Sequence, residues 1–176
     1  MVKVWDAQTG KLVKTLPVEF GSRGSFSPDG RWLATFSPDG RWHATTGGGV
    51  RLWAVGTWQE GPFIGGSWPV FSPDGKTLAV AEGVGVVRLV NLDTGTDYAR
   101  LESTGQAGLE PQCFTPDGTQ LIVVSPEDQA IYVWNLKQIR EQLAEMGLDW
   151  DLPTFPPVGK AGAPLAEPLE VRVVAD

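Results

Sequence analysis

The sequence predicts an all-β protein assembled from short antiparallel sheets. Residues 68–101 show the unit: four short apolar runs separated by three turn signals, a pattern typical of a four-stranded antiparallel meander. In its first turn, Pro73 presets φ, Asp74 accepts the second corner and Gly75 supplies the left-handed residue that returns the chain. One such unit is therefore expected to form one sheet.

The same turn recurs along the chain. Phe-Ser-Pro-Asp-Gly stands at 26–30, 36–40 and 71–75, and Phe-Thr-Pro-Asp-Gly stands at 114–118. The expected turn positions are Asp29, Gly30, Asp39, Gly40, Asp74, Gly75, Asp117 and Gly118. We interpret the four aspartates as turn formers on different sheets, because they stand too far apart in the repeat to act together.

A second repeated position follows each predicted third strand. It is occupied by Trp5-Asp6, Trp53-Ala54, Val90-Asn91 and Trp134-Asn135, at spacings of 48, 37 and 44 residues. These spacings lie near the period of about 40 to 45 residues that is typical of four-stranded propeller blades. Residues 1–136 resemble the WD-repeat β-propeller family, most closely at 2–11 (VKVWDAQTGK).

The resemblance implies a partial WD-repeat propeller of about three to four four-stranded blades, with a short C-terminal helix and tail. Blades of this family often carry a Gly-His pair, which this sequence lacks. The tryptophans are therefore expected to act by packing, and we expect Trp5, Trp53 and Trp134 to be buried between sheets.

Residues 26–35 and 36–45 form a tandem duplication that differs only at Leu33 and His43. Both copies cannot occupy one position in a sheet, so we expect either an additional strand or a long excluded hairpin. Because ten is an even number, the alternation of side chains is the same with either copy. His43 is the only histidine, and a structural or tolerated role is expected for it.

The period changes after Trp134. Asn135 can cap a helix over 135–146 with Gln138 at the third position, and the expected apolar stripe consists of Leu136, Ile139, Leu143 and Met146. The predicted organisation is a partial propeller at 1–134, a capping helix with a Trp/Pro-rich extension at 135–157, and a linker with a possible last strand at 158–176. Residues 147–157 resemble the C-termini of large bacterial WD-repeat proteins, some of which carry a Ser/Thr kinase domain.

Composition restricts the partners. The net charge of −7 and the pI near 4.7 disfavour binding to nucleic acid. No apolar run is long enough to span a membrane, so a cytoplasmic protein is expected. Cys113 is the only cysteine, which excludes an intrachain disulfide, and its place beside Phe114 predicts a buried thiol.

No catalytic, cofactor-binding or metal-binding residue is predicted. Residues 83–88 (GVGVVR) begin like a nucleotide loop but lack the third glycine and a P-loop lysine, so we interpret them as a hairpin. The expected function is a non-enzymatic protein–protein interaction scaffold whose partner the sequence does not identify. The alternatives are a regulatory segment of a WD-repeat Ser/Thr kinase with its catalytic domain elsewhere, and, less favoured, a propeller enzyme of lactonase type.

The predicted strands do not make a closed ring. They number about thirteen, whereas closed propellers have about 4 to 8 blades of four strands. Residue 2 opens on a third strand, so we expect an unpaired edge at 2–5. The sequence thus predicts a C-terminal part of a larger propeller, whose partner is either the missing blades or a self-associated copy.

Overall fold

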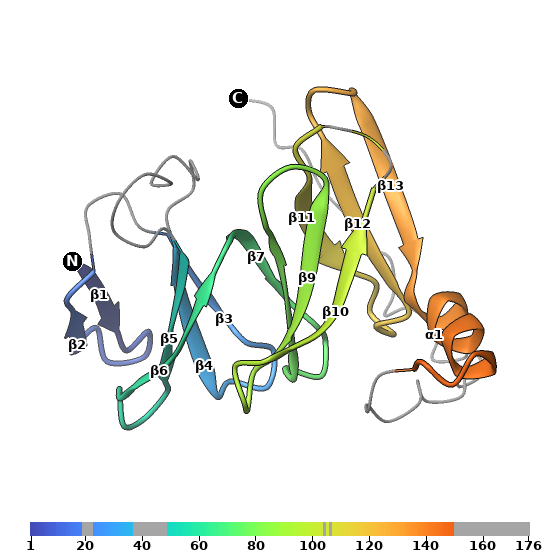
Figure 1. Ribbon diagram of the computed structural model, residues 1–176. Coiled ribbons are helices and arrows are strands. Elements are labelled where there is room, and N and C mark those ends of the chain that lie inside the picture. The colour runs from blue at the N-terminus through green and yellow to red at the C-terminus, as the bar shows by residue number, and fades with distance from the viewer. Residues whose placement is uncertain (19–22, 37–48, 104, 106, 150–176) are drawn as a thin grey trace, which may run out of the picture.

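The computed structural model describes residues 1–18, 23–36, 49–103, 105 and 107–149. These residues form thirteen strands and one helix, arranged as four antiparallel sheets that follow one another in chain order (Figure 1). The strands are β1 (Val2–Trp5), β2 (Leu12–Leu16), β3 (Arg23–Phe26), β4 (Trp32–Phe36), β5 (Gly49–Ala54), β6 (Glu60–Gly65), β7 (Ser67–Phe71), β8 (Thr77–Ala81), β9 (Val86–Asn91), β10 (Asp97–Glu102), β11 (Glu110–Phe114), β12 (Gln120–Ser125) and β13 (Ala130–Asn135).

Each strand pairs with its neighbour in the chain, so every sheet is a meander, and the all-β prediction is confirmed. The first sheet contains β1 and β2, the second β3 to β6, the third β7 to β10 and the fourth β11 to β13. Among the described residues the first sheet has two strands, and β1 has no partner on its other edge, as the sequence predicted.

The last three sheets share one register. Leu33 pairs with Trp53, and the equivalent pairs in the next two sheets are Leu78–Val90 and Leu121–Trp134. These residues lie on the face that looks toward the preceding sheet, which we call the back face. The following pairs lie on the opposite, front face: Ala34–Leu52, Ala79–Leu89 and Ile122–Val133.

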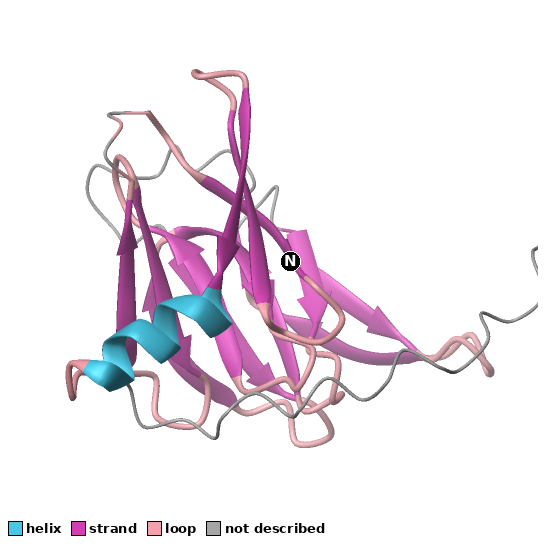
Figure 2. Ribbon diagram, turned by 90° about the vertical axis from the view of Figure 1, so that its right-hand side faces the viewer, coloured by secondary structure: helices cyan, strands magenta, loops and turns pink. Residues whose placement is uncertain are grey.

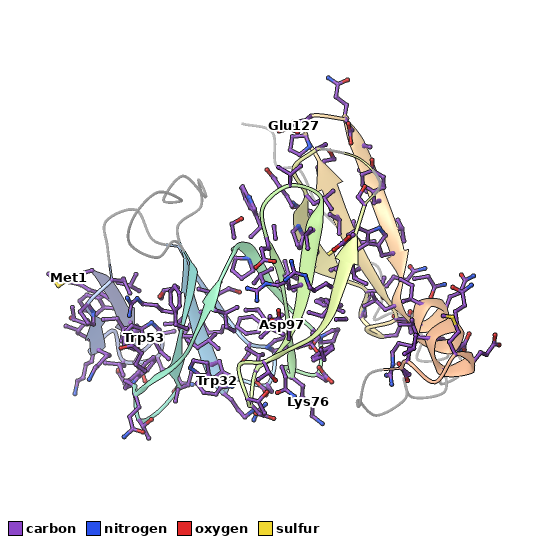
Figure 3. The ribbon with its side chains drawn as sticks, viewed as in Figure 1. Met1, Trp32, Trp53, Lys76, Asp97 and Glu127 are labelled. Atoms are coloured by element: carbon purple, nitrogen blue, oxygen red, sulfur yellow. The ribbon has the colours of Figure 1, made fainter. Side chains whose placement is uncertain are left out.

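Three apolar clusters fill the spaces between successive sheets. Leu16, Val18, Leu33 and Trp53 join the first sheet to the second, and Figure 3 shows Trp53 in this position. The front face of the second sheet packs on the back face of the third, through residues such as Leu52. The third sheet's side of that second cluster consists of Leu78, Val80, Val90 and Leu92. The third cluster joins Ala79, Val87 and Leu89 to Leu109, Leu121, Val123 and Leu136.

Two predicted buried side chains are exposed. Trp5 is 56% exposed, so the prediction of its burial was wrong: it occupies the back face of the first sheet, which has no preceding sheet among the described residues. Cys113 is also exposed. A bulge between Pro111 and Cys113 sets the register of β11, and the thiol-bearing residue pairs with Ile122 on the front face of the fourth sheet.

The repeated turns have the same hydrogen bonds in the second, third and fourth sheets. Ser27 Oγ donates to Asp29 Oδ1 at 2.6 Å, and the same oxygen accepts from the Arg31 backbone N at 3.1 Å. Both bonds recur with the same distances at Ser72, Asp74 and Lys76 and at Thr115, Asp117 and Thr119. The turn chemistry read from the sequence therefore specifies three hairpins.

The described part of the duplication assigns the first copy to the sheet. Residues 26–35 span the end of β3, the turn and most of β4. The second copy contributes the last residue of β4, and the rest of it, including Asp39, Gly40 and His43, lies outside the described residues. The second sheet has four strands in the part of the chain that is described.

The predicted helix is present as α1 (Leu136–Glu145). Asn135 Oδ1 accepts from the Gln138 backbone N at 3.0 Å and caps it. Figure 2 shows α1 crossing in front of the strands near one end of the sheets. Leu136 and Ile139 pack into the cluster between the third and fourth sheets, whereas Met146 is exposed, so the apolar stripe is shorter than expected.

Candidate interaction surfaces

The structure distributes the repeated residues over the sheets instead of gathering them. Trp5, Trp53, Val90 and Trp134 each occupy the back face of a different sheet, where they pack or, for Trp5, face outward. The residues that follow the first three make turns, and Asn135 after Trp134 caps α1. Asp6 Oδ1 accepts from Gln8 and Thr9 N, and Asn91 Oδ1 accepts from Asp93 and Thr94 N, whereas Ala54 has no side-chain oxygen for this purpose.

The turn aspartates lie on separate hairpins, and their electrostatics follow from turn geometry. Partial burial would raise the pKa of Asp29, but hydrogen bonds from Ser27 and Arg31 together with the Arg31 charge lower it below its usual value. Hydrogen bonds from Thr115 and Thr119 lower the pKa of Asp117. Both carboxylates are thus held in the ionised form that their turns need.

One turn also contacts the next sheet. Arg31 Nη1 lies 3.0 Å from Asp93 Oδ1, which joins the second sheet to the third. Gly75, with φ +68°, lies so close to Asp29 that a Cβ at this position would stand 2.4 Å from the Asp29 Cγ. The glycine is therefore required by its conformation and by the packing of neighbouring turns.

Arg88 on β9 links the third sheet to the second. The Arg88 guanidinium contacts the Gly65 carbonyl oxygen at the end of the preceding sheet, and its Nη1 lies 2.8 Å from Asp97 Oδ1. Its Nε lies 3.3 Å from Glu82 Oε1. The two carboxylates compensate a mostly buried positive charge, so Arg88 joins two sheets.

A groove of about 390 Å³ lies between β10, β13 and α1. Its apolar lining consists of Tyr98, Ala99, Leu101, Trp134, Ile139, Leu143 and Leu148, and Arg100 and Glu102 add one charge of each sign. Arg100 Nη2 also pairs with Glu82 Oε2 at 2.5 Å. Of these residues only Trp134 occupies a repeated position, and the lining of β10 follows no repeated motif, so the groove could not be recognised from the sequence.

Buried polar contacts fix the walls of this groove. The Arg140 guanidinium donates two hydrogen bonds to Asp149, Nε to Oδ1 at 3.0 Å and Nη2 to Oδ2 at 2.9 Å, and so ties the middle of α1 to the chain that follows the helix. Tyr98 shares a hydrogen bond with Thr77 on β8, and burial raises the pKa of the Tyr98 hydroxyl, which therefore stays protonated. The hydrogen bond that holds Tyr98 in the groove wall is thus made by an uncharged hydroxyl at every physiological pH.

The described residues contain neither a metal cluster nor a membrane-spanning helix. No group of three or more His, Cys, Asp or Glu side chains in that part of the chain is placed to hold a metal ion. None of its helices is long and apolar enough to cross a membrane.

No protein-family model matches the chain, and no curated protein matches it either.

Proposed function

We propose that the chain is a WD-repeat protein that serves as a protein-binding scaffold and holds an apolar segment of its partner in the groove between β10, β13 and α1. The family assignment is supported by the repeat of turn, register and packing in successive sheets. The observation that carries the function is the groove itself. Its lining combines aromatic and aliphatic side chains with a few charged groups, as in sites that recognise a ligand.

The lining favours a polypeptide segment as the ligand. Tyr98 and Trp134 supply aromatic surface of the kind enriched at protein interfaces. Arg100, which is half exposed, and Glu102 offer one donor and one acceptor group at the rim. An extended peptide that carries a large apolar side chain flanked by polar residues would match this arrangement.

The groove is held in shape by the elements around it. β10 is paired to β9, β13 is paired to β12, and α1 is fixed by the Asn135 cap at its start and by the Arg140–Asp149 bridge from its middle. A site whose walls are already ordered loses little conformational entropy when a ligand binds. This preorganisation makes the groove better suited to binding than the exposed hairpin turns.

A displayed library of random 12-residue peptides tests the proposal. Peptides enriched on the wild-type chain should bind at least about tenfold more weakly to Leu143→Lys, because a lysine would place a charge in the apolar lining. Ala144→Lys is the matched control, since Ala144 is exposed on the same helix and does not line the groove. Failure to enrich peptides, or equal loss of binding in both variants, would contradict the proposal.

A further inference from the structure

The two terminal sheets each have one apolar face that no other described element covers. On the fourth sheet it is the front face, where Ile131 is 70% exposed and Val133 is 54% exposed, and Ile122, Val124 and Cys113 lie beside them. On the first sheet it is the back face, where Trp5 and Leu12 form an exposed cross-strand pair. Figure 1 shows these sheets at opposite ends of the row.

Inside the molecule, the positions equivalent to Ile131 and Val133 are covered. In the third sheet they are Val87 and Leu89, which the fourth sheet buries completely or almost completely. The positions that do the covering belong to the back face of the following sheet and include Trp134. A front face in this protein is therefore shaped to receive a back face.

The uncovered back face of the first sheet is of this same kind. Trp5 stands at the position of Trp53 and Trp134, since Val2-Lys3-Val4-Trp5 aligns with residues 50–53 of β5. Trp53 packs between sheets with its Nε1 donating to Thr35 Oγ1 at 3.1 Å. Among the described residues, the front face of the fourth sheet and the back face of the first sheet are thus both left without a neighbouring sheet.

The charges of the two ends are also complementary. Residues 1–16 contain three lysines and one aspartate, a net side-chain charge of +2. Residues 107–135 contain Glu110, Asp117, Glu127 and Asp128 and no lysine or arginine, a net charge of −4. Charge of opposite sign favours the meeting of the first sheet with a fourth sheet and disfavours contact of either end with its own kind.

We propose that two copies of this chain associate head to tail, so that the back face of the first sheet of one copy covers the front face of the fourth sheet of the other. Both copies can make this contact at once, which gives a closed pair with two identical interfaces. The described residues of each copy form four sheets, and the resulting ring of eight lies within the range of about 4 to 8 found for closed propellers.

The mass of the purified full-length chain gives the first test. Sedimentation equilibrium should show a concentration-dependent approach to twice 19.0 kDa. Raising the salt concentration from about 0.05 M to about 0.5 M should weaken the association, because the opposite charges of the first and fourth sheets are then screened. A chain that remains at 19.0 kDa up to about 0.5 mM has its end faces covered in another way, and the proposal fails.

Two variants separate head-to-tail pairing from other arrangements. Trp5→Glu places a negative charge against the acidic fourth sheet, and Ile131→Lys places a positive charge against the basic first sheet. Each variant alone should dissociate at least about tenfold more readily than the wild type. Val84→Lys is the control: Val84 is exposed in the hairpin between β8 and β9, on neither end face, and should leave association unchanged.

Mixing the two variants supplies the decisive measurement. Trp5→Glu keeps an intact front face and Ile131→Lys keeps an intact back face, so the mixture should recover a 1:1 pair that neither variant forms alone. The second contact of that pair joins the new glutamate to the new lysine and is favourable as well. If either single variant pairs as well as the wild type, or the mixture stays monomeric although both variants retain the wild-type circular dichroism, the head-to-tail arrangement is refuted.

Discussion

Trp5 and Trp53 occupy the same position in successive sheets, yet Trp5 is 56% exposed and Trp53 is 5% exposed. The difference comes from the neighbouring sheet and not from the residue. A described sheet, the first, packs against the Trp53 ring, whereas no described sheet packs against the Trp5 ring. Burial of a repeated residue is therefore decided by its place in the row of sheets.

Trp53→Ala is expected to lower the free energy of unfolding by about 3 to 5 kcal/mol, because it removes a buried aromatic side chain and leaves a cavity. Trp5→Ala should change it by less than about 1 kcal/mol, since that ring is mostly in water. Urea unfolding of both variants at low chain concentration measures the two values without a contribution from self-association. Equal losses would show that the first sheet is covered.

Gly75→Ala and Gly30→Ala form a second matched pair. Both glycines have positive φ, +68° and +72°, so an alanine is strained at either site by about 1 to 2 kcal/mol. At Gly30 no atom stands within 4 Å of the added Cβ, whereas at Gly75 it meets Asp29 at 2.4 Å. Gly75→Ala should therefore be clearly the more destabilising variant in thermal unfolding. If Gly30→Ala costs as much, packing of the Gly75 turn against Asp29 contributes nothing.

Ala54 stands at the same turn position as Asp6 and Asn91 but, unlike them, has no side-chain hydrogen-bond acceptor. Its turn keeps the backbone bonds of the others: Trp58 N donates to Ala54 O at 2.7 Å, as Gly95 N donates to Asn91 O at 2.8 Å. Ala54→Asn should thus gain bonds to the following N–H groups and raise stability by about 0.5 to 1 kcal/mol. Ala54→Leu, of similar size but without an acceptor, serves as the control in urea unfolding, and an equal gain there would contradict this explanation.

The turns, the strands and the start of α1 could be predicted from the sequence because their causes are local. Ser-Pro-Asp-Gly fixes its hairpin through bonds among five neighbouring residues, and Asn135 caps a helix through a bond to Gln138. The register of strand pairing followed from the same turns. The order of the sheets in space follows in turn from the short links between them.

The features that sequence reasoning missed depend on contacts between sheets. Nothing near Arg88 in the sequence reveals that Gly65 of the preceding sheet accepts its hydrogen bond. Cys113 was expected to be buried beside Phe114, but it lies on the front face of the fourth sheet, which no other described element covers. The groove escaped notice for the same reason, since Tyr98 and Trp134 meet α1 only after folding.

The tandem duplication gives the last prediction. Deleting residues 36–45 leaves Leu33 in place, whereas deleting residues 26–35 leaves the same sequence with a histidine at the position of Leu33. Leu33 is buried in the cluster between the first and second sheets and pairs with Trp53. The first deletion removes Phe36, the last residue of β4, and otherwise only shortens the stretch of sequence between β4 and β5. The entropy cost of closing such a stretch depends weakly on its length, so stability should be unchanged or slightly higher.

The second deletion should lower stability, and more so in acid. Burial disfavours the charged imidazole and depresses the pKa of this histidine in the folded state, whereas in the unfolded chain the pKa stays near about 6.5. As the pH falls through that value, the unfolded state binds a proton that the folded state refuses, and stability is lost. Melting curves of both deletion variants between pH 8 and pH 5 measure the difference. Parallel curves, with no added loss below about pH 6.5 for the histidine-bearing variant, would mean that the position of Leu33 is open to water or that the chain has shifted its register.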